Sequence, residues 1–145
     1  MKNMDRRTAV ALGLASATAP ALTLVAAGPA AAQTGSPAQG KEIMPGVRQV
    51  DLSPPRPSKL PGFTTVSMRD LVFQPGAEIP EHPMDNAMLC HVTEGVLSVR
   101  QDGKEFVARK GDAWDCGKGT REGTKNNGST VAVMRLIDLD MPMTT

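Results

Sequence analysis

The chain has 145 residues, enough for one domain with a tail, and its hydrophobic and charged fractions of 40% and 21% are ordinary for a globular protein. A formal net charge of +1, with three Phe, one Trp and no Tyr, offers neither a basic surface nor stacking platforms, which excludes nucleic-acid binding. Two Cys allow one disulfide and exclude an all-cysteine zinc site.

Residues 1–32 have the pattern of an export signal. A positive start with Arg6-Arg7 precedes an apolar stretch from Thr8 to about Ala27, and Ala30-Ala31-Ala32 forms a small-residue cleavage site. The arginine pair resembles a twin-arginine signal; an ordinary secretory signal and a retained membrane anchor are the alternatives. Because the stretch is rich in Ala and Thr and contains Pro20, we expect no stable membrane anchor after signal removal. The expected location is periplasmic or secreted.

Residues 33–62 are rich in Pro, Gly and small polar residues, and they show no apolar period. The sequence Pro54-Pro55-Arg56-Pro57 is typical of an irregular extended segment. We therefore predict an extended arm or linker with one short strand near Val47–Leu52. Disorder is the alternative for residues 33–41.

Residues 63–140 predict a series of short strands. The Asp102-Gly103 pair between two apolar runs is a strong type I′ hairpin signal. The spacing of turns, without an amphipathic helix between them, favours an antiparallel sandwich or barrel. Residues 141–145 are expected to be a tail. The predicted strands are Thr64–Phe73, Ala87–Thr93, Val96–Gln101, Lys104–Arg109, Ala113–Cys116, Arg121–Lys125 and Thr130–Leu139.

A first glycine-framed motif begins this segment. Gly76 is followed after five residues by His82, and Met84, Met88 and Gly95 follow at fixed intervals. The spacing resembles the first motif of the cupin superfamily, G-x5-H-x-H-x3-E-x6-G. Met84 stands where that motif has its second His, and Met88 stands where it has Glu.

A second motif extends the resemblance. Gly111, Gly119 and Asn126 match the family's G-x5-P-x-G-x2-H-x3-N, while Gly117 replaces the Pro and Glu122 replaces the His. The resemblance implies an all-β fold, an antiparallel jelly-roll β-barrel. In the family, three His and one Glu bind a divalent metal inside the barrel. Since only the first His is kept here, a family-typical iron or manganese site is not expected.

The substituted positions point to a softer metal site. Strand alternation places Met88 and Cys90 on one face and His91 on the other. Imidazole, thioether and thiolate groups suit copper, above all Cu(I), better than hard cations. The first hypothesis is an exported cupin-domain protein whose barrel binds copper or a small ligand. Its metal ligands would be His82, Met84 and Met88, with Cys90 or Glu122 completing the site.

Other interpretations stay open at this point. In an enzyme acting on a small molecule, His82 and Glu122 would serve as acid and base or as two ligands of a weaker metal site. A degenerate barrel would have replaced its metal with apolar packing, in which Met is a common filler. Cys90 and Cys116 would form a disulfide, two separate thiols or soft ligands. A homodimer is compatible with each interpretation.

Overall fold

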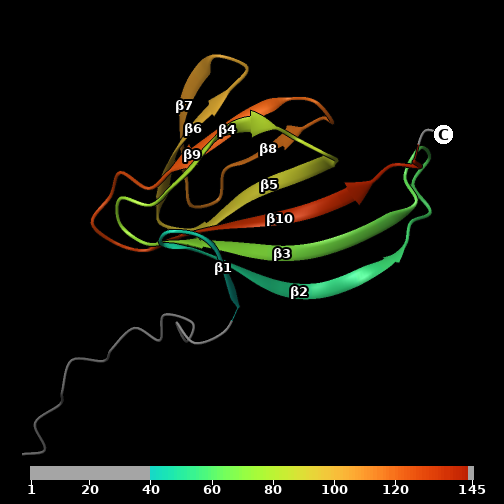
Figure 1. Ribbon diagram of the computed structural model, residues 1–145, viewed down its shortest axis with the longest axis horizontal. Coiled ribbons are helices and arrows are strands. Elements are labelled where there is room, and N and C mark those ends of the chain that lie inside the picture. The colour runs from blue at the N-terminus through green and yellow to red at the C-terminus, as the bar shows by residue number, and fades with distance from the viewer. Residues whose placement is uncertain (1–39, 144–145) are drawn as a thin grey trace, which may run out of the picture. The chain divides into compact units, whose positions relative to one another are not determined.

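The computed structural model describes residues 40–143, which form ten strands and no helix (Figure 1). The predicted signal peptide, residues 33–39 of the expected arm and the last two residues of the tail lie outside this range. Nothing in the described range is a helix long and apolar enough to cross a membrane. The strands are β1 (Lys41–Met44), β2 (Val47–Pro57), β3 (Thr65–Phe73), β4 (Glu78–Pro83), β5 (Ala87–Glu94), β6 (Val96–Gln101), β7 (Lys104–Arg109), β8 (Ala113–Cys116), β9 (Arg121–Lys125) and β10 (Ala132–Asp140).

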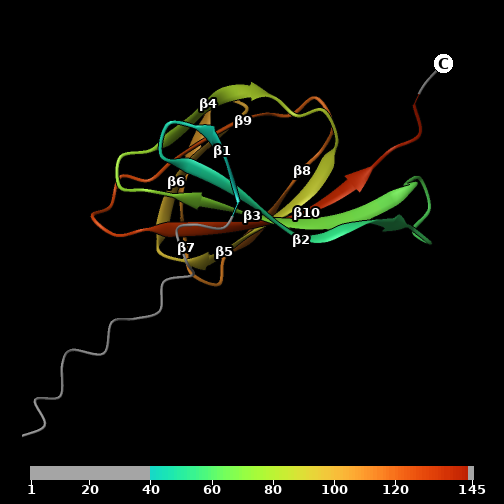
Figure 2. The same ribbon diagram turned by 60° about the horizontal axis from the view of Figure 1, so that its bottom comes forward.

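The strands form two antiparallel sheets that face each other (Figures 1 and 2). The larger sheet has the order β1-β2-β3-β10-β5-β8, and the smaller has the order β4-β9-β6-β7. Strands that follow one another in sequence therefore often belong to different sheets, as in a jelly roll. The predicted all-β, antiparallel jelly-roll fold is confirmed.

The turn chemistry explains several of these elements. Asp102 and Gly103 both have positive φ, 47° and 78°, and they join β6 to β7 with Gln101 opposite Lys104, as a type I′ hairpin requires. Gly95, at the end of the first motif, has φ 74°, and a Cβ added there would lie 2.8 Å from Ala132. The motif glycine is thus required by the close approach of β10 to this turn.

The expectation of an arm needs correction for residues 40–62. This segment supplies β1 and β2 to the larger sheet, and β2 pairs along its length with β3. The Val47 side chain is fully buried, opposite Phe73. Proline, which lacks an N–H group, is tolerated at irregular pairings, and the register of β2 shifts between Ser53 and Arg56. The strand expected near Val47–Leu52 is longer than predicted, and β4 was not predicted.

The core lies between the inner faces of the two sheets. In β5 the inward side chains of Met88 and Cys90 are 6% and 0% exposed, whereas Leu89 is 46% exposed and His91 also faces solvent. This alternation is the one that the sequence predicts. The other apolar side chains of the core are Val47, Leu71, Phe73, Ala77, Met84, Val92, Leu97, Val99, Ala108, Cys116, Ala132, Met134 and Leu136.

Candidate functional site

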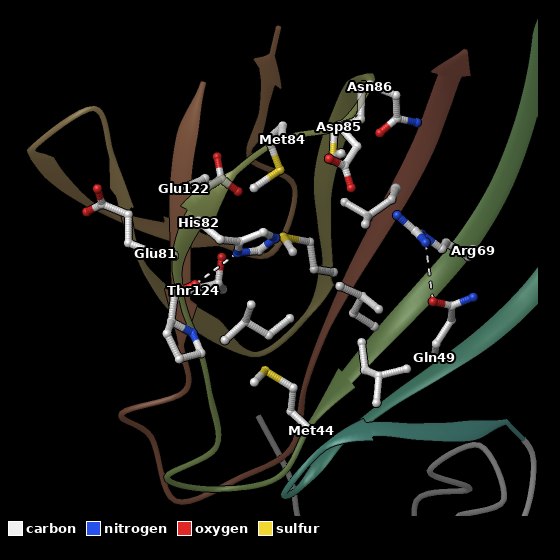
Figure 3. Close-up of a pocket in the computed structure, with 18 residues that line it drawn as sticks. Met44, Gln49, Arg69, Glu81, His82, Met84, Asp85, Asn86, Glu122 and Thr124 are labelled. Carbon is white, nitrogen blue, oxygen red and sulfur yellow. Dashed lines mark hydrogen bonds between the residues drawn. The ribbon is translucent and has the colours of Figure 1, made fainter. Parts of the chain in front are cut away.

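A pocket of about 460 Å³ contains all four residues predicted as metal ligands (Figure 3). It lies between the two sheets, because its walls come from β1, β2, β3, β5 and β10 of the larger sheet and from β4 and β9 of the smaller one. Its lining combines apolar and thioether side chains with polar groups. The lining residues are Ile43, Met44, Gln49, Arg69, Leu71, Ile79, Pro80, Glu81, His82, Met84, Asp85, Asn86, Met88, Glu122, Gly123, Thr124, Met134 and Leu136.

His82 belongs to β4, directly across from Glu122 on β9. Much of the residue is exposed, and its Nδ1 atom lies 2.9 Å from the carbonyl oxygen of Pro80. Figure 3 shows the ring turned toward the pocket. Among the described residues, no hydrogen bond joins the imidazole to the Glu122 carboxylate, which is the pair that the acid–base hypothesis uses.

The two methionines predicted as ligands approach the pocket from different elements, and Met44 and Met134 also line it. Met84 follows β4, and its backbone N–H and carbonyl are hydrogen-bonded to Thr120 and Gly119 at 2.8 Å each. Met88 belongs to β5, where it lies opposite Cys116 of β8 on one side and Asp138 of β10 on the other. Both Met side chains are largely buried, so their sulfurs are shielded from water.

Glu122 is buried, although the sequence left open whether it faces the interior or solvent. Its Oε2 atom accepts hydrogen bonds from the Cys116 thiol at 2.6 Å, the Trp114 indole at 3.0 Å and the Gln101 amide at 3.3 Å. Trp114 also packs edge-to-face on Phe106, with ring centroids 5.5 Å apart. The carboxylate is therefore oriented by neutral donors from β6 and β8.

Two free thiols lie beside this carboxylate. The Sγ atoms of Cys90 and Cys116 are 4.0 Å apart, and both residues are buried. One donor atom from each cysteine and one from Glu122 all lie within 4.8 Å of one another. The hydrogen bond to Cys116, burial and the nearby Glu122 charge raise the pKa of the Cys90 thiol. Both cysteines are free thiols in the structure, so they do not form the disulfide that was one of the alternatives.

A second buried carboxylate belongs to β10 of the larger sheet. Asp138 forms an ion pair with Arg69, with Nη2 to Oδ1 at 3.0 Å, and accepts a hydrogen bond from Asn86 at 3.3 Å. Burial raises the pKa of Asp138, although the Arg69 charge and the Asn86 hydrogen bond act in the opposite direction. Arg69 also donates to Gln49 at 3.2 Å.

Sequence reasoning missed four residues that shape the site: Arg69, Asn86, Gln101 and Trp114. A signal for Arg69 was present, because Arg69 lies on the same face of β3 as the apolar residues Leu71 and Phe73. No comparable signal marked Gln101 or Trp114. Their roles depend on the contact of β6 and β8 with Glu122 on β9.

Comparisons with known proteins agree with this architecture. The family model described as "Cupin domain" matches residues 69–140. No curated protein matches the sequence. The fold is similar to that of a solved RmlC-like cupin from Shewanella frigidimarina, with a TM-score of 0.57, 18% sequence identity, and coverage of 71% of this chain and 84% of that one.

Two further solved structures have the same fold. KdgF from a Halomonas species gives a TM-score of 0.58 at 17% identity, covering 70% of this chain and 86% of that one. A protein described as a sugar phosphate isomerase of the cupin superfamily, from Silicibacter pomeroyi, gives 0.54 at 20% identity, covering 68% and 62%. At such identities the similarity establishes the fold alone.

Proposed function

Because the chain belongs to the cupin superfamily, we propose that it is an exported cupin-domain protein whose barrel binds a soft metal ion, copper(I) in particular. The observation that supports this most directly is the position of Glu122. Its side chain lines a pocket that also contains four thioethers, and it contacts one of two buried thiols. Sulfur donors favour Cu(I) strongly over Mg²⁺, Ca²⁺ or Mn²⁺.

The pocket supplies the route by which an ion reaches these donors. His82 at its wall is exposed, whereas Met84, Met88 and Glu122 are buried. An arriving ion therefore exchanges water for thioether and carboxylate ligands as it moves inward. Such a stepwise exchange suits carriage or storage of copper.

A titration tests the proposal. The reduced protein competes anaerobically with a chromogenic Cu(I) chelator, and we expect one ion per chain to be withdrawn from it. Mn²⁺, Mg²⁺ and Ca²⁺ are titrated in parallel by calorimetry, and we expect no comparable binding because thioethers and thiols are poor ligands for hard cations. Absence of Cu(I) binding, or a preference for Mn²⁺, would contradict the proposal.

A second candidate function is small-molecule binding or catalysis. The pocket volume of about 460 Å³ falls in the range of roughly 300–1,000 Å³ that is usual for ligand pockets. A similar solved cupin is described as a sugar phosphate isomerase. His82 and Glu122 would be the acid–base pair or ligands of a weaker metal site. A thermal-shift screen with small sugar phosphates tests this function; a hit that persists in His82→Gln would argue against a role for the imidazole.

Export and self-association are separate parts of the proposal. Replacing Arg6-Arg7 by Lys-Lys should leave the precursor in the cytoplasm, because twin-arginine recognition depends on that pair. Unimpaired export of that variant would favour the general secretory route. The homodimer stays a prediction, which sedimentation of the purified protein tests.

A further inference from the structure

We propose that Cys90, Cys116 and Glu122 form the metal site itself, in which two cysteine sulfurs and one carboxylate oxygen hold a thiophilic ion. This inference rests on the proposed function and assigns its ligands. The site lies behind the pocket, reached past Glu122 and Met88, which line that pocket while the two cysteines do not. His82 and Met84 then belong to the access route.

The separation of the sulfurs fits a shared ion. Two sulfurs bound at about 2.3 Å to one ion are about 3.8 Å apart for a tetrahedral angle and about 4.0 Å apart for a trigonal one. The Sγ atoms of Cys90 and Cys116 are 4.0 Å apart. A disulfide needs about 2.05 Å between them. The two thiols are therefore spaced for an ion between them.

The carboxylate needs only a small movement to join them. The Cys116 thiol donates to Glu122 Oε2 at 2.6 Å. Across a tetrahedral ion a sulfur and an oxygen are about 3.6 Å apart, so the two atoms must separate by about 1 Å. Each cysteine that becomes a ligand releases its thiol proton to solvent as the S–H bond is replaced by an S–metal bond.

The charge balance around Glu122 favours a cation. No Lys, Arg or His within residues 40–143 forms an ion pair with this carboxylate. Its hydrogen-bond donors are the uncharged groups of Cys116, Trp114 and Gln101. A buried carboxylate without a cation is costly, and a bound metal ion compensates it directly.

The groups around the ligands are already oriented. Gln101 Nε2 lies 3.2 Å from Cys116 Sγ, 3.3 Å from Glu122 Oε2 and 2.8 Å from the Asp115 carbonyl oxygen. The Trp114 indole on β8 donates a hydrogen bond to the same Glu122 oxygen. Donors of this kind orient metal ligands and stabilise a thiolate sulfur. Met88, directly opposite Cys116, brings a thioether to the side facing the pocket.

Single-site variants of the full chain, purified anaerobically, test this assignment with two probes. Cu(I) is measured by chelator competition, and Co²⁺ is measured by its sulfur-to-metal charge-transfer absorption. Cys90→Ser and Cys116→Ser replace only sulfur by oxygen. We expect either change to lower the affinity by at least about 100-fold, more than the loss of a residue that merely orients a ligand. Val92→Thr replaces a methyl group by a hydroxyl at the next buried inward position of β5 and controls for any destabilisation.

The outcomes separate this inference from the proposed function. If Cu(I) binds to the wild type and to both serine variants alike, while Met88→Leu loses it, the thiol site is wrong and copper binding stands. If Co²⁺ gives a cysteine-dependent charge-transfer band but Cu(I) does not bind, the thiol site stands and the copper proposal fails. If neither probe binds, or if the exported protein contains a Cys90–Cys116 disulfide and no metal, the thiol site is overturned.

Discussion

Glu122 and Asp138 are two buried carboxylates on opposite sheets, and their surroundings differ in one respect. Asp138 on β10 is 5% exposed and has a cation beside it, the Arg69 guanidinium at 3.0 Å. Glu122 on β9 is 4% exposed and is surrounded by a thiol, an indole and an amide. The Asp138 charge is thus balanced by the Arg69 cation, whereas the Glu122 carboxylate has hydrogen bonds only.

The comparison separates a structural group from a candidate ligand. An ion pair within the sheet already satisfies Asp138, so adding a metal there would displace Arg69 first. At Glu122 an incoming cation displaces only thiol protons and gains two sulfur ligands. A carboxylate therefore has an ion-pair partner in one sheet and, in the proposed site, the role of a metal ligand in the other.

The largest effect on stability is expected from Glu122→Ala. The change leaves the Trp114 indole N–H without its acceptor and truncates a buried side chain, whereas Gln101 keeps the Asp115 carbonyl oxygen. It should lower the free energy of unfolding by about 3 kcal/mol, as the unsatisfied donor and the cavity add. Urea unfolding followed by Trp114 fluorescence measures it. Glu94→Ala, at an exposed glutamate at the end of β5, is the control and should stay within about 0.5 kcal/mol of wild type. Equal losses in both variants would remove the distinction drawn for Glu122.

A smaller and pH-dependent effect is expected from Arg69→Met. Removing the cation leaves the Asp138 charge unpaired and should cost about 2 kcal/mol at pH 7, below the range for fully buried pairs because the Arg69 side chain is 30% exposed. Burial already raises the pKa of Asp138, and the substitution raises that pKa further. At a pH between the pKa of Asp138 in the unfolded chain and its higher pKa in the folded variant, the folded state holds a proton on Asp138 that the unfolded chain has lost. The cost should therefore shrink as the pH falls through the native pKa of Asp138, which unfolding at pH 7 and pH 5 measures. A cost that is independent of pH would contradict this account.

The smallest change in stability is expected from Met88→Leu. The swap conserves volume and should cost less than about 1.5 kcal/mol. It removes the thioether opposite Cys116, so Cu(I) affinity should fall while folding survives. Met68→Leu is the matched control, since Met68 lies on β3 outside the pocket lining. Affinities that match in the two variants would show that the Met88 sulfur takes no part in binding.

The part of the fold from β5 to β10 could be predicted because its signals are local. Asp102-Gly103 specifies its own turn, and alternation along β5 specifies which side chains face inward. The bounds predicted for β6, β7, β8 and β9 agree with the structure. The strand β2 was predicted too short and β4 was missed, because proline-rich strands lack the apolar alternation of a local signal. Pairing with β3 and β9 holds them in place.

The sequence by itself determined the antiparallel all-β class and the inward positions of Met88 and Cys90, since turns and strand alternation depend only on neighbouring residues. The jelly roll was what the resemblance of the two motifs to the cupin family implied. Only the tertiary structure decided that Glu122 turns toward Cys116 and Trp114, without a hydrogen bond to His82 in the described chain. That orientation depends on how β6, β8 and β9 pack together, because the packing of these strands brings the Gln101, Trp114 and Cys116 donors to one carboxylate oxygen. No spacing along the chain contains that information.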